Sequence, residues 1–259
     1  MIMTNEYPKT WKDLQDLVCK YFNEAGYIAK TPVNIGLVRG SAEVDVFVEA
    51  KNEIFKTIIC ECKYWDNPIP QEKVHAFRTV VADSGANLGI VISKKGFQKG
   101  AKEAAYKTNV LLKTWEEFLE MIERQWIIRR LIKLKIRSNP LSDYTDFLMI
   151  ERTRGKIIDI EEYNRLLTQY MMVFSFIWSL DLEKLSPECI SFNNSNYSYC
   201  NVLFDYLEKE IDNAILKFEK LFQTCPLTED EKSDGAHLLF TLLADLFKDI
   251  KIEEENNIK

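Results

Sequence analysis

Three residues of this 259-residue chain have the types and spacing that catalysis needs: Asp45, Glu61 and Lys63. Asp45 lies in the alternating stretch "SAEVDVFVEA" (41–50), and the other two lie in "KTIICECKYW" (56–65). Alternation along a strand puts Glu61 and Lys63 on one face, away from the apolar positions between them. If the two strands pair through a turn at residues 51–53, residue 45 lies near residue 61. The sequence therefore predicts two carboxylates and one ammonium at one point on a sheet.

The chemistry of such a group is specific. Two carboxylates a few ångströms apart repel, so either one takes up a proton or a cation lies between them. Mg²⁺ prefers carboxylate oxygens and waters, often with substrate phosphates completing its shell. A metal held there can lower the pKa of a bound water and neutralise charge on a phosphate. Lys63 could orient the attacking water and stabilise the transition state, so the group is typical of phosphodiester hydrolysis.

The surrounding sequence predicts the elements that position these residues. Apolar residues at helical spacing, with stop signals, indicate helices at 10–25, 71–85, 97–108 and 114–136, the last with a Thr–x–x–Glu capping box. Strands are expected at 41–50, 54–64, 88–93 and 109–113, after a strand-like piece at 27–40. The predicted order is α-β-β-β-α-β-α-β, an α/β unit.

This order and its motifs resemble a known family. Asp45 followed by Glu61–Cys62–Lys63 matches the PD-(D/E)xK nuclease signature. The segments "LQDLVCKYFNEAGY", "RGSAEVDVFVEA", "IICECKYWDNPIP" and "SGANLGIVISKKGFQKGAKEAA" resemble its Mrr-like restriction endonuclease branch, over about residues 10–120. The resemblance implies a restriction-endonuclease-like domain, a central mixed sheet flanked by helices. It also implies a Mg²⁺-dependent DNA endonuclease, with Mn²⁺ as a possible substitute. Asp45 and Glu61 would ligate the metal, Lys63 would assist the water, and the role would be defence against foreign DNA.

The sequence departs from the family pattern at two positions near the site. Members of this branch often carry a Glu in the first helix, where this chain has Gln15. A Gln offers a neutral oxygen but no charge, so the resemblance leaves open whether one or two metals bind. Val44 stands where the motif name has a proline. Two accessory candidates are Glu43, either close to the metal or solvated, and Gln71, which could approach a phosphate from the start of its helix.

Further candidates have a second interpretation beside the functional one. Lys94, Lys95 and Lys99 follow the apolar strand at 88–93 and could contact a DNA backbone, but a solvated loop is an equal expectation. Trp65 could contact a substrate, although core packing is the favoured interpretation. His75 is interpreted as a surface histidine.

The second half of the chain has a different character. We expect residues 1–122 to form the nuclease-like domain and residues 123–259 an all-α domain that serves oligomerisation, regulation or DNA contact. Helices are predicted at 160–182, 200–222 and 228–250, with a polar loop at 191–201. The basic stretch "RQWIIRRLIKLKIR" (124–137) either binds DNA or pairs with the acidic C-terminal helices, and the second is preferred.

Composition limits the expected functional class and cellular compartment of the protein. The net charge of −6 argues against a general nucleic-acid coat, the six cysteines are scattered, and the N-terminus lacks an apolar signal segment, which together favour the cytoplasm. The apolar run at 170–180 is too short to span a bilayer and is expected to be a buried helix. The expected partners are DNA, further copies in a dimer or larger oligomer, and a regulatory protein or nucleotide bound by the C-terminal domain. Two alternatives stay open: a structure-specific repair or junction nuclease, and an inactive nuclease-fold subunit that binds DNA or a partner.

Overall fold

The computed structural model describes residues 3–50, 57–145, 153–180, 185 and 190–232. The chain forms two compact units, one spanning Met3–Arg129 and the other beginning at Arg130. The boundary falls within the long helix α4 (Trp115–Ser138). Each unit is described by itself.

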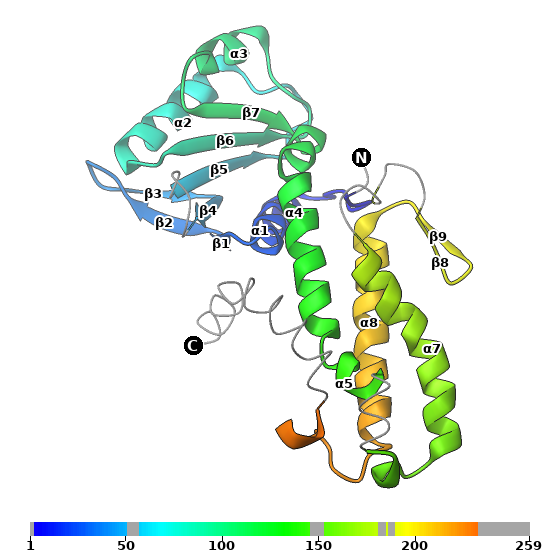
Figure 1. Ribbon diagram of the computed structural model, residues 1–259. Helices are drawn as coiled ribbons and strands as arrows, with labels where there is room; N and C mark the ends of the chain where they lie inside the picture. The colour runs from blue at the N-terminus through cyan, green and yellow to red at the C-terminus, as the bar shows by residue number, and fades with distance from the viewer. Residues whose placement is uncertain (1–2, 51–56, 146–152, 181–184, 186–189, 233–259) are drawn as a thin grey trace. The chain divides into compact units, whose positions relative to one another are not determined.

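The first unit is built on a mixed sheet of five strands in the order β1-β4-β5-β6-β7 (Figure 1). These are β1 (Ile28–Lys30), β4 (Val46–Glu49), β5 (Thr57–Lys63), β6 (Leu88–Ser93) and β7 (Val110–Thr114). The first three strands pair antiparallel and the last three parallel. Two further strands, β2 (Val33–Gly36) and β3 (Ser41–Val44), form a separate small sheet. The expected mixed sheet with flanking helices is confirmed.

Helices cover both faces of this sheet. They are α1 (Trp11–Glu24), α2 (Gln71–Ser84) and α3 (Lys99–Ala105), and aromatic residues in the first part of α4 pack against α1. α1 contacts β1, β4 and β5, whereas α2 packs on β6 and against α3. Ile59, Phe77 and Val91 belong to one buried cluster, so the face of β5 that carries Ile59 is the face that α2 covers. A Cβ at Gly89 would lie 2.4 Å from the Val81 side chain, so glycine permits the close approach of α2 and β6.

The expected single strand at 41–50 is wrong in one respect. The structure has two strands there, and Asp45 lies at the bend between β3 and β4. Val44 pairs with Val33 of β2, whereas Val46 pairs with Cys60 of β5. Val44 therefore packs in the cluster under α2 rather than continuing the face of Val46. The alternation of side chains between the two faces is interrupted at Asp45, because the chain passes there from the small sheet to the main sheet.

The second unit begins with the rest of α4 and continues with short and long helices. Its further elements are α5 (Leu141–Thr145), η1 (Arg154–Lys156), α7 (Ile160–Ser179), β8 (Ile190–Phe192), β9 (Ser195–Tyr197), α8 (Cys200–Glu219) and η2 (Glu229–Glu231). The predicted helices at 160–182 and 200–222 are confirmed. The predicted helix at 228–250 is described only to residue 232, as the short turn η2, and the rest lies outside the described residues.

The predicted polar loop at 191–201 is wrong, because residues 190–197 form a hairpin. Phe192 pairs with Ser195, and Asn193 and Asn194 between them have φ values of 51° and 61°. Two successive positive φ values are typical of the tight turn that suits hairpins, and asparagine tolerates this conformation. The Phe192 ring stacks on Phe176 of α7 at a centroid distance of 4.2 Å, which anchors the hairpin.

The basic stretch at 124–137 meets acidic side chains, as preferred from the sequence. The Arg130 guanidinium lies 2.7 Å from a carboxylate oxygen of Asp205 and 3.3 Å from one of Glu208. Arg137 lies 2.6 Å from a carboxylate oxygen of Asp212. These pairs join α4 to α8 within the second unit.

Within the described ranges, no helix combines the length and apolarity that crossing a bilayer requires. The apolar run at 170–180 lies mostly in α7, which is buried on one face only. Tyr170, Val173 and Ile177 are buried, but Met172 is 61% exposed.

The N-terminal segment is fixed to α1 by a hydrogen-bonded acid. The Tyr21 hydroxyl, on α1, donates to a carboxylate oxygen of Glu6, and Lys20 forms an ion pair of 2.8 Å with the same carboxylate. Burial tends to raise the pKa of Glu6, but the hydrogen bonds from Lys20 and Tyr21 outweigh burial and lower that pKa below its usual 4.5.

Replacing this acid should give a pH-dependent loss of stability. A lowered folded-state pKa stabilises the fold above the unfolded-state pKa, and that contribution disappears as the pH falls through the folded-state pKa. We expect Glu6→Gln to lower the free energy of unfolding at pH 7 by about 1 kcal/mol, the net value of one hydrogen bond. The difference should vanish in strongly acidic buffer, and thermal unfolding of both proteins across pH would measure it. A difference that persists there would contradict the assignment.

Candidate active site

The two strands that carry the candidate residues pair in the register predicted from the sequence. Val46 lies opposite Cys60, and Val48 lies opposite Ile58. One further step along this register brings Asp45 beside Glu61. The hairpin therefore delivers the aspartate to the end of β5 where the glutamate and the lysine stand.

Asp45 is held by two short hydrogen bonds. One carboxylate oxygen accepts the backbone N–H of Cys62 at 2.6 Å, and the other accepts the side-chain amide of Gln15 at 2.6 Å. Because Val44 pairs with Val33, it is not available as the strand partner of Cys62. The Asp45 carboxylate takes that N–H instead. Gln15 comes from α1 and is only 7% exposed, so Asp45 is fixed between the sheet and this helix.

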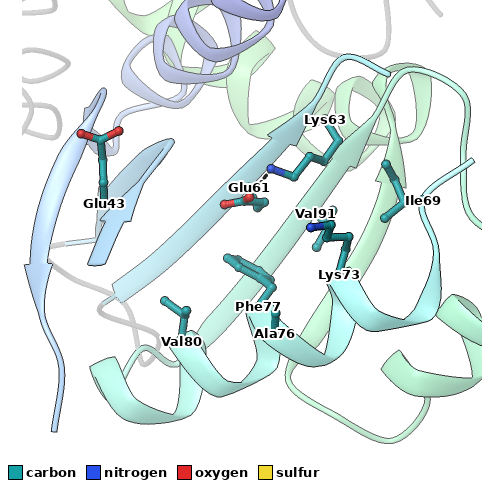
Figure 2. A pocket seen from close by; sticks show the side chains of 9 residues that line it. All are labelled: Glu43, Glu61, Lys63, Ile69, Lys73, Ala76, Phe77, Val80 and Val91. Atoms are coloured by element: carbon teal, nitrogen blue, oxygen red, sulfur yellow. Dashed lines mark ion pairs between the residues drawn. The ribbon is translucent and has the colours of Figure 1, made fainter. Parts of the chain in front are cut away.

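Glu61 and Lys63 form an ion pair on the face of β5 that turns toward α2 (Figure 2). Their side chains are 26% and 21% exposed. Burial raises the pKa of Glu61, the ammonium of Lys63 acts in the opposite direction, and the nearby charge of Asp45 adds to the rise. The net result is an acid with a raised pKa, whose charged form is costly unless a cation lies beside it.

An open pocket of about 270 Å³ lies in front of this ion pair. Its lining comes from β3, β5, β6, α2 and the residue Ile69, and consists of Glu43, Glu61, Lys63, Ile69, Lys73, Ala76, Phe77, Val80 and Val91 (Figure 2). Lys73, in the first turn of α2, brings a second cation to this pocket and was not among the sequence candidates. A signal existed: only residues 64–70 join β5 to α2, so the first turn of α2 must return close to Lys63.

Of the two accessory candidates, Glu43 lines the pocket and Gln71 does not. Glu43 is exposed on β3 at the edge of the pocket, apart from the Glu61–Lys63 pair (Figure 2). Gln71 is outside the pocket lining, where its side-chain nitrogen lies 2.9 Å from a ring nitrogen of His75. His75 is exposed, as expected. The favoured core packing of Trp65 is wrong, because its side chain is 41% exposed.

The three lysine candidates after β6 do not line the pocket. Lys94 forms an ion pair of 2.7 Å with Asp66. Lys95 is exposed. Lys99 lies 3.8 Å from a carboxylate oxygen of Glu103 and is fully open to solvent at 93% exposure. A contact with DNA stays a prediction for all three.

The residues around Asp45 suit a hydrated hard cation rather than a closed cage. Among the described residues, no three His, Cys, Asp or Glu side chains are grouped closely enough to hold a metal alone. Asp45 and Glu61 supply two carboxylates, which is the ligand count with which Mg²⁺ typically keeps several waters. Each Asp45 oxygen accepts one hydrogen bond, and a carboxylate has about four acceptor sites, so capacity for a cation is left.

Residues 9–122 match the family model described as restriction endonuclease, Mrr_cat. This part of the chain, less than half of the 259 residues, is similar to that restriction endonuclease domain. The match confirms the resemblance stated from the sequence, and it covers the whole arrangement of Gln15, Asp45, Glu61 and Lys63. No curated protein sequence matches the chain.

Two solved structures resemble the chain that carries this restriction endonuclease domain. One is described as a protein of unknown function, with 16% identity, a TM-score of 0.38, and coverage of 64% of this chain and all of that one. The other is a repair endonuclease from Pyrococcus abyssi, with 17% identity and a TM-score of 0.32. It is matched over 44% of this chain and 50% of its own.

The Gln15–Asp45 hydrogen bond gives a test of the cation site. Gln15→Glu would place a second carboxylate where an amide now donates, so without divalent cations we expect a loss of about 1–3 kcal/mol of unfolding free energy. Added Mg²⁺ or Mn²⁺ should restore this variant more than the wild type, because a cation is attracted to the extra charge. Gln15→Ala, which loses the bond but adds no charge, is the matched control. Thermal unfolding with chelator and with each metal measures the difference, and equal restoration of both variants would argue against a cation at Asp45.

Proposed function

We propose that this protein is a DNA endonuclease that hydrolyses phosphodiester bonds with a divalent cation, Mg²⁺ or Mn²⁺. One observation carries the proposal: Asp45 contacts the strand that carries Glu61 and Lys63, and these two residues line an open pocket, in a part of the chain that matches a restriction endonuclease model. The fold family supports nuclease chemistry, and the pair of carboxylates supports the cation.

The roles follow from the contacts. Asp45 and Glu61 would hold the cation, and Gln15 and the Cys62 N–H would keep the Asp45 carboxylate in its orientation. The bound cation would supply a more acidic water and charge neutralisation at the phosphate. Lys63, which pairs with Glu61, would direct its ammonium to the attacking water and to the charge that develops on the phosphate. The buried cluster beneath β5 keeps these groups on a rigid strand.

We propose foreign DNA as the target, on the support of the restriction endonuclease family alone. The described residues supply one Asp45–Glu61–Lys63 group per chain, so cutting both strands of a duplex needs two chains or two successive nicks. We therefore propose a dimer or larger oligomer. The second unit is the candidate for assembly, or for binding a regulatory protein or nucleotide. Sedimentation that shows a monomer with and without DNA would remove the oligomer from the proposal.

Cleavage by point variants tests the proposed roles. We expect Lys63→Met to lower the rate of plasmid nicking by about 10²-fold or more, the usual cost of removing a transition-state donor. Asp45→Asn and Glu61→Gln should abolish the dependence on divalent cation together with the activity. The matched control is Lys12→Met, because Lys12 also forms a carboxylate pair, 2.9 Å from Asp16, on the surface of α1. The assay is conversion of supercoiled plasmid with Mg²⁺, Mn²⁺ or chelator.

The outcomes separate the alternatives. Wild-type nicking that the three variants retain would refute the assigned roles. Absence of nicking by wild type on linear, plasmid and branched DNA would favour the inactive binding subunit. Cleavage of branched DNA alone would favour the structure-specific nuclease.

A further inference from the structure

An exposed aromatic side chain lies near two lysines just after the end of β5. Trp65 follows β5 by two residues and is 41% exposed. The Lys63 ammonium lies 5.8 Å from the centroid of its ring, and the Lys73 ammonium lies 5.9 Å from the same centroid. Both lysines also line the pocket in front of Glu61. The indole and the proposed catalytic pocket therefore share both cations.

Lys73 forms no ion pair among the described residues of the first unit. In the part of the chain that the structure describes, no carboxylate lies within ion-pair distance of its ammonium. Lys63 is paired with Glu61, and Lys94, next to Tyr64, is paired with Asp66. Figure 2 shows Lys73 reaching from α2 toward the strand that carries Glu61. A cation held in this way beside a pocket is suited to a phosphate.

Packing does not explain the position of the indole. A tryptophan that served the core would be covered, as Trp115 and Trp126 are in the same unit, at 2% and 0% exposure. A cation–π contact helps to hold each lysine, but it needs only one face of the ring. An open indole flanked by cations matches the composition of surfaces that bind single-stranded nucleic acid, where bases stack on aromatic rings and lysines follow the phosphates.

We propose that Trp65 and Lys73 form a nucleotide platform that binds an unpaired DNA base, and its phosphate, next to the bond that is cut. This inference rests on the proposed function. A base can stack on Trp65 only when it has left the duplex stack, which costs energy in intact DNA and little in single-stranded or locally opened DNA. The preferred substrate is therefore DNA with unpaired nucleotides at the cleavage point.

Equilibrium binding without turnover tests the platform. The probe is one labelled oligonucleotide, used alone and annealed to its complement, with the wild-type protein and variants in chelator and in Ca²⁺. We expect Trp65→Ala to weaken binding of the single strand about tenfold or more, the usual effect of losing a stacked base, and to change duplex binding less than about twofold. Trp65→Phe should keep most of the single-strand affinity. Trp11→Ala is the matched control, since Trp11 is also exposed, at 63%, in the same unit.

Replacement of Lys73 should change DNA binding differently from replacement of Trp65. We expect Lys73→Gln to weaken binding of both DNA forms and to reduce the slope of log affinity against log salt by about one. The surface lysine variant Lys12→Gln should leave that slope unchanged. Circular dichroism and the thermal midpoint establish that each variant is folded.

The results separate this inference from the proposed function. If Trp65→Ala weakens both DNA forms equally or neither form, the platform is wrong, even if the protein cuts DNA. If the single-strand effect appears but no cleavage is found under any condition, the platform stands as a binding surface and the endonuclease proposal fails. Absence of measurable binding to either form by wild type would overturn the platform.

Discussion

The Asp45 carboxylate is the point on which the arrangement of the first unit depends. One of its oxygens accepts a hydrogen bond from the backbone N–H of Cys62, near the end of β5. The other accepts a hydrogen bond from the side-chain amide of Gln15 on α1. Hydrogen bonds to an ionised acceptor are shorter and about twice as strong as neutral ones. One side chain thus replaces a missing strand partner and ties the sheet to a helix, beside the strand that carries Glu61. A neutral apolar residue at this bend would leave a backbone donor and a buried amide unpaired.

The same geometry lowers the stability of the fold, because it places the Glu61 carboxylate in a partly buried position close to Asp45. Burial and the proximity of Asp45 raise the pKa of Glu61, and Lys63 compensates only part of this. The cost can be tolerated because the strand beneath is fixed by apolar packing: Ile59 and Cys60 are fully buried, and β5 pairs with a neighbour on each side. A rigid strand that ends in an ion-paired acid of raised pKa is suited to bind a further cation, at some cost to its own stability. That is the arrangement expected of a site that binds charge from outside the chain.

Much of this could be predicted from the sequence, because alternation and register are local rules. A turn predicted at 51–53, which lies outside the described residues, implies which residues face each other, and the observed pairing of Val46 with Cys60 agrees with that register. The bend at Asp45 could not be predicted, since "VDV" alternates in the same way whether the strand continues or the chain changes sheets. The deciding contact is Val44 with Val33, which depends on a small sheet formed by a distant segment. Lys73 was not predicted, and Trp65 was assigned to the core, for a similar reason: the contact between them depends on how α2 returns to β5. The Asn193–Asn194 turn did carry a local signal, because consecutive asparagines are suited to positive φ.

Charge distribution explains why a chain with a net charge of −6 could still attract DNA. The basic run at 124–137 is the obvious candidate from the sequence, yet Arg130 and Arg137 are neutralised by carboxylates of α8, and the Lys135 ammonium donates to a backbone carbonyl at 2.9 Å. Their charge therefore serves the second unit. Under the proposed function, cations near the pocket would attract a phosphate, since Lys73 lies there and Glu61 already has Lys63 as a partner. A few such charges beside a pocket concentrate the local potential more effectively than the same number spread over a surface. The net charge is thus a poor indicator of where this protein would bind DNA. The positions of single lysines around Glu61 and Trp65 are a better indicator.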